Sequence, residues 1–156
     1  MKPLVKGILY ITGFSCPPEE ITRVLNVEPS RSWLAGDLIG PTVRAFESNG
    51  WQLDSQLTDE TDPEVHLREL LRRIPDQTVQ HLRKATTEWN LQFSIVVEMQ
   101  DETPPFNLGV DTLQLVASLG ASVDVDLYVT GDDEEAPTRP DPERPFGGRI
   151  GLITKR

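Results

Sequence analysis

The fold is decided by the stretch LQFSIVVEM at residues 91–99, in which apolar and polar side chains alternate. Its odd-numbered residues are all apolar, and its even-numbered residues are polar apart from Val96. A period of two is typical of a strand with one face in the core. Because Val96 makes the second face partly apolar, we expect this strand to lie in the interior of a sheet.

A helix and another strand are expected after this stretch. Apolar residues at positions 110, 113, 116 and 117 have helical spacing, and Gly120 can end the helix in the left-handed conformation. Residues 123–129 then alternate again, with Asp124 and Asp126 on one face. The pattern predicts a strand, a helix and a strand in succession.

Two helices are expected before this stretch. Asp62 is suited to cap a helix whose first residue is Pro63, and apolar residues follow at positions 67, 70, 71 and 74. A second helix is expected after Pro75, with apolar residues from position 79 to Trp89. We expect both helices to cover one face of the sheet.

The N-terminal third contains a strand at residues 5–12, a short helix from Pro17 to Asn26 and an irregular connection at residues 27–41. Asn49-Gly50 then separates two extended segments, residues 43–48 and 51–55, which is a strong signal for a two-residue hairpin. Such a hairpin would place Ser48 opposite Trp51 and Phe46 opposite Leu53.

Taken together, the elements predict a two-layer, ferredoxin-like α+β sandwich with a mixed or antiparallel sheet and helices on one face. We assign residues 1–130 to one domain. Residues 131–156 form an acidic, proline-rich C-terminal tail, in which residues 149–154 could add a short edge strand or no element at all.

The composition narrows the classes of partner. The formal net charge is -10 and the isoelectric point about 4.6, which argues against nucleic acid and membrane surfaces as partners. A basic protein would be attracted by the same charge. With Cys16 as its one cysteine, no secretory signal and no long apolar run, the chain is expected to be cytoplasmic.

Several landmarks along the chain are those of a known family. They are Pro18-Glu19-Glu20-Ile21, Asn26-Val27-Glu28-Pro29, Trp33 followed by Gly36-Asp37, Trp51, and the run from Leu119 to Tyr128. Together they resemble the DUF4279 family of uncharacterised bacterial proteins, over roughly Val5 to Val129. Some members resemble immunity proteins, which neutralise toxins of neighbouring bacteria, and the resemblance implies that association without a mechanism.

Few residues suggest catalysis or metal binding. His66 and His81 have no metal-ligand spacing and are expected to face solvent, and no cofactor is expected. Asp124 and Asp126 could form an acid/base pair, although a solvated strand face is the favoured interpretation. Cys16 is interpreted as a helix-start or core residue. The acidic run at residues 132–135 lacks the spacing of a calcium-binding EF-hand.

Arg31, Trp33, Arg44 and Trp51 are the most informative candidate group, because aromatic and arginine side chains are typical of interfaces and of anion pockets. The two tryptophans could line one concavity. The default interpretation is that Trp33 anchors a loop and Trp51 packs in the core.

The sequence leaves two main hypotheses for function. The first is a non-enzymatic binding protein, in its most concrete form an immunity-type inhibitor that uses an acidic surface to block a basic toxin. The alternative is a small-molecule-binding or sensing module that uses the region of Trp33, Arg44 and Trp51. A hydrolase built on Asp124 and Asp126 ranks last, and the sequence does not decide the oligomeric state.

Overall fold

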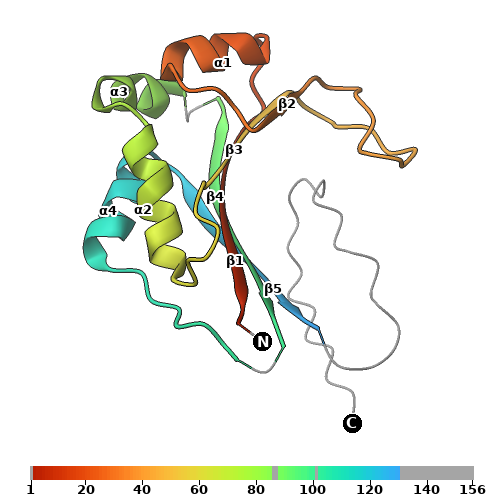
Figure 1. The fold of residues 1–156 in the computed structure, drawn as a ribbon. Helices are drawn as coiled ribbons and strands as arrows, with labels where there is room; N and C mark the ends of the chain where they lie inside the picture. Colours follow the sequence, from red (N-terminus) through yellow and green to blue (C-terminus); the bar gives the residue numbers. More distant parts are fainter. Residues whose placement is uncertain (1, 86–87, 101, 131–156) are drawn as a thin grey trace.

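The computed structural model describes residues 2–85, 88–100 and 102–130 (Figure 1). Its elements are, in chain order, β1 (Leu4–Thr12), α1 (Pro18–Leu25), β2 (Arg31–Trp33), β3 (Gly50–Asp54), α2 (Pro63–Arg73), α3 (Asp76–Ala85), β4 (Asn90–Met99), α4 (Val110–Ser118) and β5 (Ser122–Val129). The predicted tail at residues 131–156, with its short edge strand at 149–154, lies outside the described residues.

The strands form one mixed sheet in the order β2-β3-β1-β4-β5. β1 pairs antiparallel with both β3 and β4, β2 pairs antiparallel with β3, and β5 joins β4 in parallel through α4. All four helices lie on one side of this sheet (Figure 1). The α+β class, the mixed sheet and the one-sided helices are confirmed. The ferredoxin-like arrangement stays a prediction.

The core lies between the helices and the odd-numbered side chains of the central strands. Leu9 of β1 and its partners Leu53 and Phe93 on the two neighbouring strands are buried side by side. Ile21 of α1 and Leu67 of α2 cover the same core on the helix side of the sheet. The alternation seen at residues 91–99 therefore marks the face that the helices cover.

The helix ends follow local capping chemistry. The Asp62 carboxylate accepts a hydrogen bond of 2.9 Å from the Glu64 backbone N–H, and Pro63 occupies the first turn, as the sequence predicts. Gly120 has a φ of 68° after α4, which confirms the predicted left-handed helix end. Asn26 takes the same conformation after α1, with a φ of 53°.

The predicted two-residue hairpin at Asn49-Gly50 is wrong. β3 pairs instead with β2, which places Trp33 opposite Gly50, and the β3 residue Leu53 pairs with Leu9 and not with Phe46. Of the described residues other than glycine, Asn26 alone has a positive φ, so Asn49 does not adopt the conformation that a type I′ turn requires.

The Asn49 side chain has a different role from the one that the hairpin signal implied. Its Oδ1 accepts a hydrogen bond of 2.9 Å from the Ala35 backbone N–H, and its Nδ2 donates one of 3.0 Å to the Cys16 carbonyl oxygen. Asn49 thus ties the long loop at residues 34–49 to the chain before α1. The irregular connection predicted at residues 27–41 contains β2, which at three residues is too short for periodicity to reveal.

His66 is buried, so its predicted exposure is wrong, whereas His81 is exposed as expected. The His66 Nδ1 lies 2.6 Å from the Ser55 Oγ, and its Nε2 lies 3.1 Å from the Glu60 carbonyl oxygen. These two partners satisfy both ring nitrogens, which is what allows an imidazole to be buried. The backbone and Cβ of His66 come close to β1 at Gly7, where there is no side chain in the way.

Gly7→Ala tests this close approach. An added Cβ at position 7 would lie 2.8 Å from the His66 Cβ, so α2 would have to move away from β1. We expect a loss of about 1–3 kcal/mol in the free energy of unfolding, measured by urea denaturation. Lys6→Ala, at the neighbouring exposed position, is the control and should change it by less than about 0.5 kcal/mol. An equal effect of both substitutions would contradict the packing argument.

Candidate functional site

The candidate site is the sheet face opposite the helices, which we call the open face (Figure 1). It is formed by the side chains whose strand positions alternate with those of the core. Its charged and tyrosine residues are Lys6, Tyr10, Arg31, Asp54, Glu98, Asp124, Asp126 and Tyr128. On the described strands, this face therefore carries four carboxylates and two cationic groups, which gives it a net negative charge.

Tyr10 on β1 is the central member of the open face. Burial raises the pKa of its hydroxyl to about 12, and the negative charges of Asp54 and Asp126 add to that increase. The Arg31 guanidinium acts in the opposite direction on the same pKa, and Tyr128 raises it slightly. Since these groups come from β2, β3 and β5, the sheet gathers them around Tyr10 from distant parts of the sequence.

An aromatic cluster borders the open face at the β2 end. The Trp33 and Phe46 rings are stacked, with centroids 4.5 Å apart, and the Tyr10 ring meets Trp33 edge-on at 6.5 Å. The Arg31 guanidinium lies 5.6 Å from the Trp33 ring centroid and 5.4 Å from that of Phe46. This packing holds the loop at residues 34–49 so that it projects beyond the sheet, on the side away from the helices (Figure 1).

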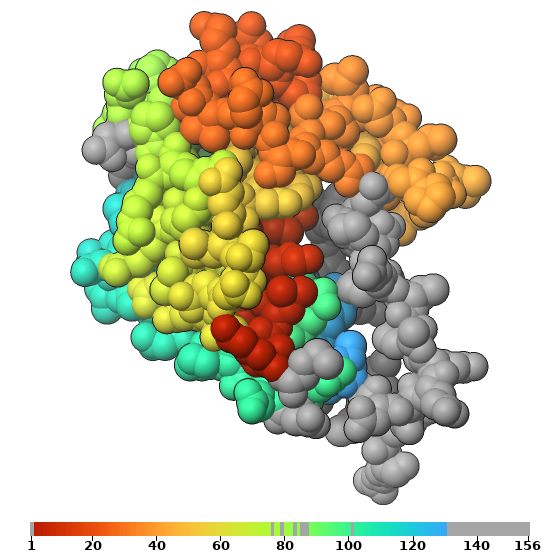
Figure 2. Space-filling model, viewed as in Figure 1, coloured from red at the N-terminus to blue at the C-terminus, as the bar shows by residue number. Residues whose placement is uncertain are grey.

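The same loop stands out from the body of the molecule in a space-filling view (Figure 2). Two hydrogen bonds join the start of the loop to its end. The Trp33 Nε1 donates one of 3.1 Å to the Ser48 carbonyl oxygen, and the Asn49 Oδ1 accepts one of 2.9 Å from the Ala35 backbone N–H. Arg44 is exposed on this loop. The loop is therefore a fixed border of the open face, with a cationic residue on it.

The structure separates the predicted group of Arg31, Trp33, Arg44 and Trp51. Trp51 is 0% exposed on the helix side of the sheet, where its Nε1 donates a hydrogen bond of 3.0 Å to the Thr22 hydroxyl. Trp33 is on the other side, since it faces Gly50 in the strand pairing. The shared concavity of the two tryptophans is wrong, because neighbouring positions 50 and 51 point to opposite faces.

Asp124 and Asp126 both lie on the open face, where Ser94 and Val96 are their partners on β4. Two positions apart on one strand, they are separated by about 6.6 Å along the chain direction. The negative charge of Asp126 contributes to the raised pKa of Tyr10, a relation that the sequence did not predict. Tyr10 was missed because its neighbours in space are not its neighbours in the chain, although its even position in the first strand was a usable signal.

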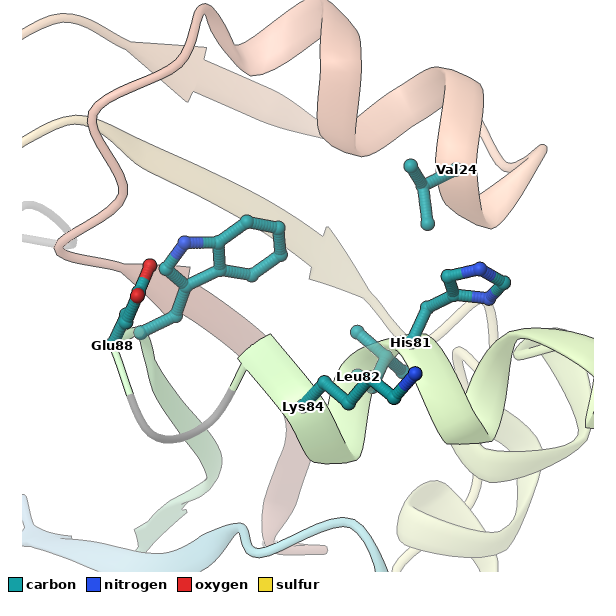
Figure 3. A pocket seen from close by; sticks show the side chains of 6 residues that line it. Val24, His81, Leu82, Lys84 and Glu88 are labelled. Carbon is teal, nitrogen blue, oxygen red and sulfur yellow. The ribbon is translucent and has the colours of Figure 1, made fainter.

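Two cavities lie on the helix side of the molecule. One of about 290 Å³ lies between α1 and α3, where His81 faces Val24 (Figure 3), and Trp89 is among its lining residues. The other, of about 400 Å³, lies between α2 and α4. Ligand pockets in proteins measure about 300–1,000 Å³, so the second cavity is within that range and the first is just below it.

Residues 2–85, 88–100 and 102–130 contain no group of three or more histidine, cysteine, aspartate or glutamate side chains placed to hold a metal ion. In the same part of the chain, no helix has the length and apolar character needed to cross a bilayer.

Comparison with known proteins identifies a family without a known activity. The family described as "Domain of unknown function (DUF4279)" matches residues 4–130, which include every helix and strand described above. No curated protein and no solved structure matches the chain.

Gly50→Ala tests how the aromatic cluster is held to the sheet. A Cβ at position 50 would lie 2.0 Å from two carbon atoms of the Trp33 indole, so the ring would have to leave its place. We expect a loss of about 1–3 kcal/mol in unfolding free energy and a red shift in the fluorescence of Trp33. Repeating the substitution in a Trp33→Phe background identifies the ring; an undiminished fluorescence shift there would contradict the assignment.

Absorbance at 295 nm tests the electrostatics of Tyr10. The folded pKa of about 12 exceeds the ordinary value of about 10, so the stability that neutral Tyr10 contributes is present below pH 10 and is lost as the pH rises towards 12. Tyr10→Phe should remove the high-pH transition, and Asp54→Asn should lower its midpoint. If Tyr10 titrates near pH 10 while circular dichroism shows a folded chain, the argument fails.

Proposed function

The chain belongs to the DUF4279 family, whose function is unknown, and we propose that it is a non-enzymatic binding protein that takes a basic protein partner on its open face. The observation that carries this proposal is the grouping of Asp54, Glu98, Asp124 and Asp126 on one side of the sheet. The partner would approach the side that the helices leave bare.

Charge supports a basic partner. The open face is net negative, and the whole chain has a formal charge of -10, so both the local and the long-range field favour a cationic surface. Complementary charge of this kind mainly raises the association rate and excludes wrong partners. The proposal therefore implies binding that weakens as salt concentration rises.

The aromatic border supports a protein rather than a small cation. Tyrosine, tryptophan and arginine are the residues that most often dominate the energy of protein interfaces, and Tyr10, Trp33 and Arg31 adjoin one another at the open face. Trp33 is only 6% exposed, so it supports the shape of the border more than it offers contact area. Arg44 on the projecting loop is placed to set the orientation of the partner.

The open face is built on paired strands that pack against the core on their other side. β1 and β4 are the central strands, and the side chains on their other face form the core. A surface built on paired strands loses little conformational entropy when it binds, which favours affinity. This is the property expected of a stoichiometric inhibitor that acts by covering its target.

The most concrete form of the proposal is an immunity-type inhibitor of a basic bacterial toxin in the cytoplasm. Such a protein needs a stable complementary surface and no chemistry of its own. The geometry does not favour the alternative of a ligand pocket between Trp33 and Trp51, because the two rings lie on opposite faces of the sheet. The acid/base pair of Asp124 and Asp126 remains an untested hypothesis, which the proposed partner surface does not require.

Affinity purification of the tagged chain from its native cells tests the proposal. We expect a basic protein to be recovered in stoichiometric amount at low salt and to be released at high salt. The double variant Asp124→Asn/Asp126→Asn should lose this partner. Glu19→Gln/Asp111→Asn removes the same charge from exposed positions on α1 and α4 and should retain it.

Each outcome has a distinct meaning. Loss of the partner from both double variants would mean that only total charge matters, and would contradict an open-face site. Recovery of the chain alone at both salt concentrations would contradict the binding proposal itself. Persistence of the partner in the Asp124→Asn/Asp126→Asn variant would place the interface on another surface.

A further inference from the structure

The groove between α2 and α4 has a feature that the open face lacks, a local excess of positive charge over an apolar floor. The cavity measures about 400 Å³. Its lining residues are Arg68, Leu71, Arg72, Ile74, Leu115, Ser118 and Leu119. No carboxylate is among these lining residues, although the chain as a whole is strongly acidic.

The apolar part of the groove is continuous from floor to rim. Ile74 and Leu119 are buried at its base, where they belong to the main core. Leu71 is packed against the same core, while Leu115 on the facing helix is 51% exposed. Covering Leu115 with an apolar ligand would remove water from a side chain that the fold leaves half in solvent.

The two arginines stand one helical turn apart on α2. The Arg68 Nε donates a hydrogen bond of 3.1 Å to the Thr112 hydroxyl and lies 3.8 Å from the Glu64 carboxylate, so its charge is partly compensated. Arg72 is exposed, and within the described part of the chain its guanidinium forms no ion pair. Arg72 is therefore the cation with capacity to bind an anion.

We propose that this groove binds a small anionic amphiphile, with its carboxylate on Arg72 and its apolar body over Leu71, Ile74 and Leu115. Charge complementarity selects the head group, because the lining holds two guanidinium groups and no acid. The volume is sufficient for a drug-sized or medium-chain ligand. The site lies on the helix side of the sheet, so it is separate from the partner surface proposed for the open face (Figure 1).

The first step of the test uses octanoate, octan-1-ol and octyltrimethylammonium with the full chain, observed by amide chemical-shift perturbation. Octanoate should bind saturably and shift amides within residues 68–74 and 115–119. Octan-1-ol has the same apolar body without charge and should bind about tenfold more weakly, and the cation should not compete. Equal affinity for octanoate and octan-1-ol would overturn the charge argument, and shifts confined to other residues would overturn the location.

Arg72→Gln is the second step. It should weaken octanoate binding about tenfold and leave octan-1-ol binding unchanged, whereas Leu115→Ala should weaken both ligands. Arg23→Gln removes one positive charge from an exposed position on α1, outside the groove, and is the matched control, with no expected change. If Arg72→Gln and Arg23→Gln have the same effect on octanoate, the site is not the groove. Arg72-dependent binding to phosphatidylglycerol vesicles without octanoate binding would also overturn the proposal.

Discussion

The pairing of β1 with β4 is the constraint on which the rest of the structure depends. Their antiparallel register runs from Leu4 opposite Glu98 to Thr12 opposite Asn90, without a break. Because side chains alternate along a strand, this register assigns every residue of both strands to the helix side or to the open face. A slip of β1 by one position would turn Leu9 to the open face and Tyr10 towards the helices, while Phe93 of β4 stayed in the core. The hydrophobic core and the candidate site are therefore two consequences of one register.

Sequence periodicity predicted the features that depend on adjacent residues, whereas the features that depend on strand pairing appear only in the structure. The caps at Asp62 and Gly120 and the alternation of residues 91–99 could be predicted because each depends on a few adjacent residues. The hairpin at Asn49-Gly50 failed because the glycine is needed for another reason: the Trp33 indole lies against its Cα. His66 failed in the same way, since its burial depends on Gly7 and Ser55, which belong to other elements. Both wrong predictions concern residues whose role depends on a contact with a residue that is distant in the sequence.

The candidate site shows the same division. Arg31, Asp124 and Asp126 were identified from residue type, and the sheet places all three on the open face. Their relation to Tyr10 could not be predicted, because it requires the strand order β2-β3-β1-β4-β5, which joins residues more than one hundred positions apart. Trp51 shows the converse. Its residue type is typical of an interface, but its odd-numbered position in β3 places it in the core.

The two proposed sites make opposite use of charge, and their separation makes this possible. Screening at physiological salt acts over about 8 Å, so an anion held at the α2 arginines and a cation approaching the open face respond mainly to their own surroundings. Between them lies the packed layer of helix and sheet side chains that includes Leu67, Leu70 and Ile95. An acidic protein can thus keep a local cationic groove, provided that a layer of core separates it from the carboxylates. Ligand in the groove would then affect the partner only through movement of α2 against β1, which the close contact between His66 and Gly7 resists.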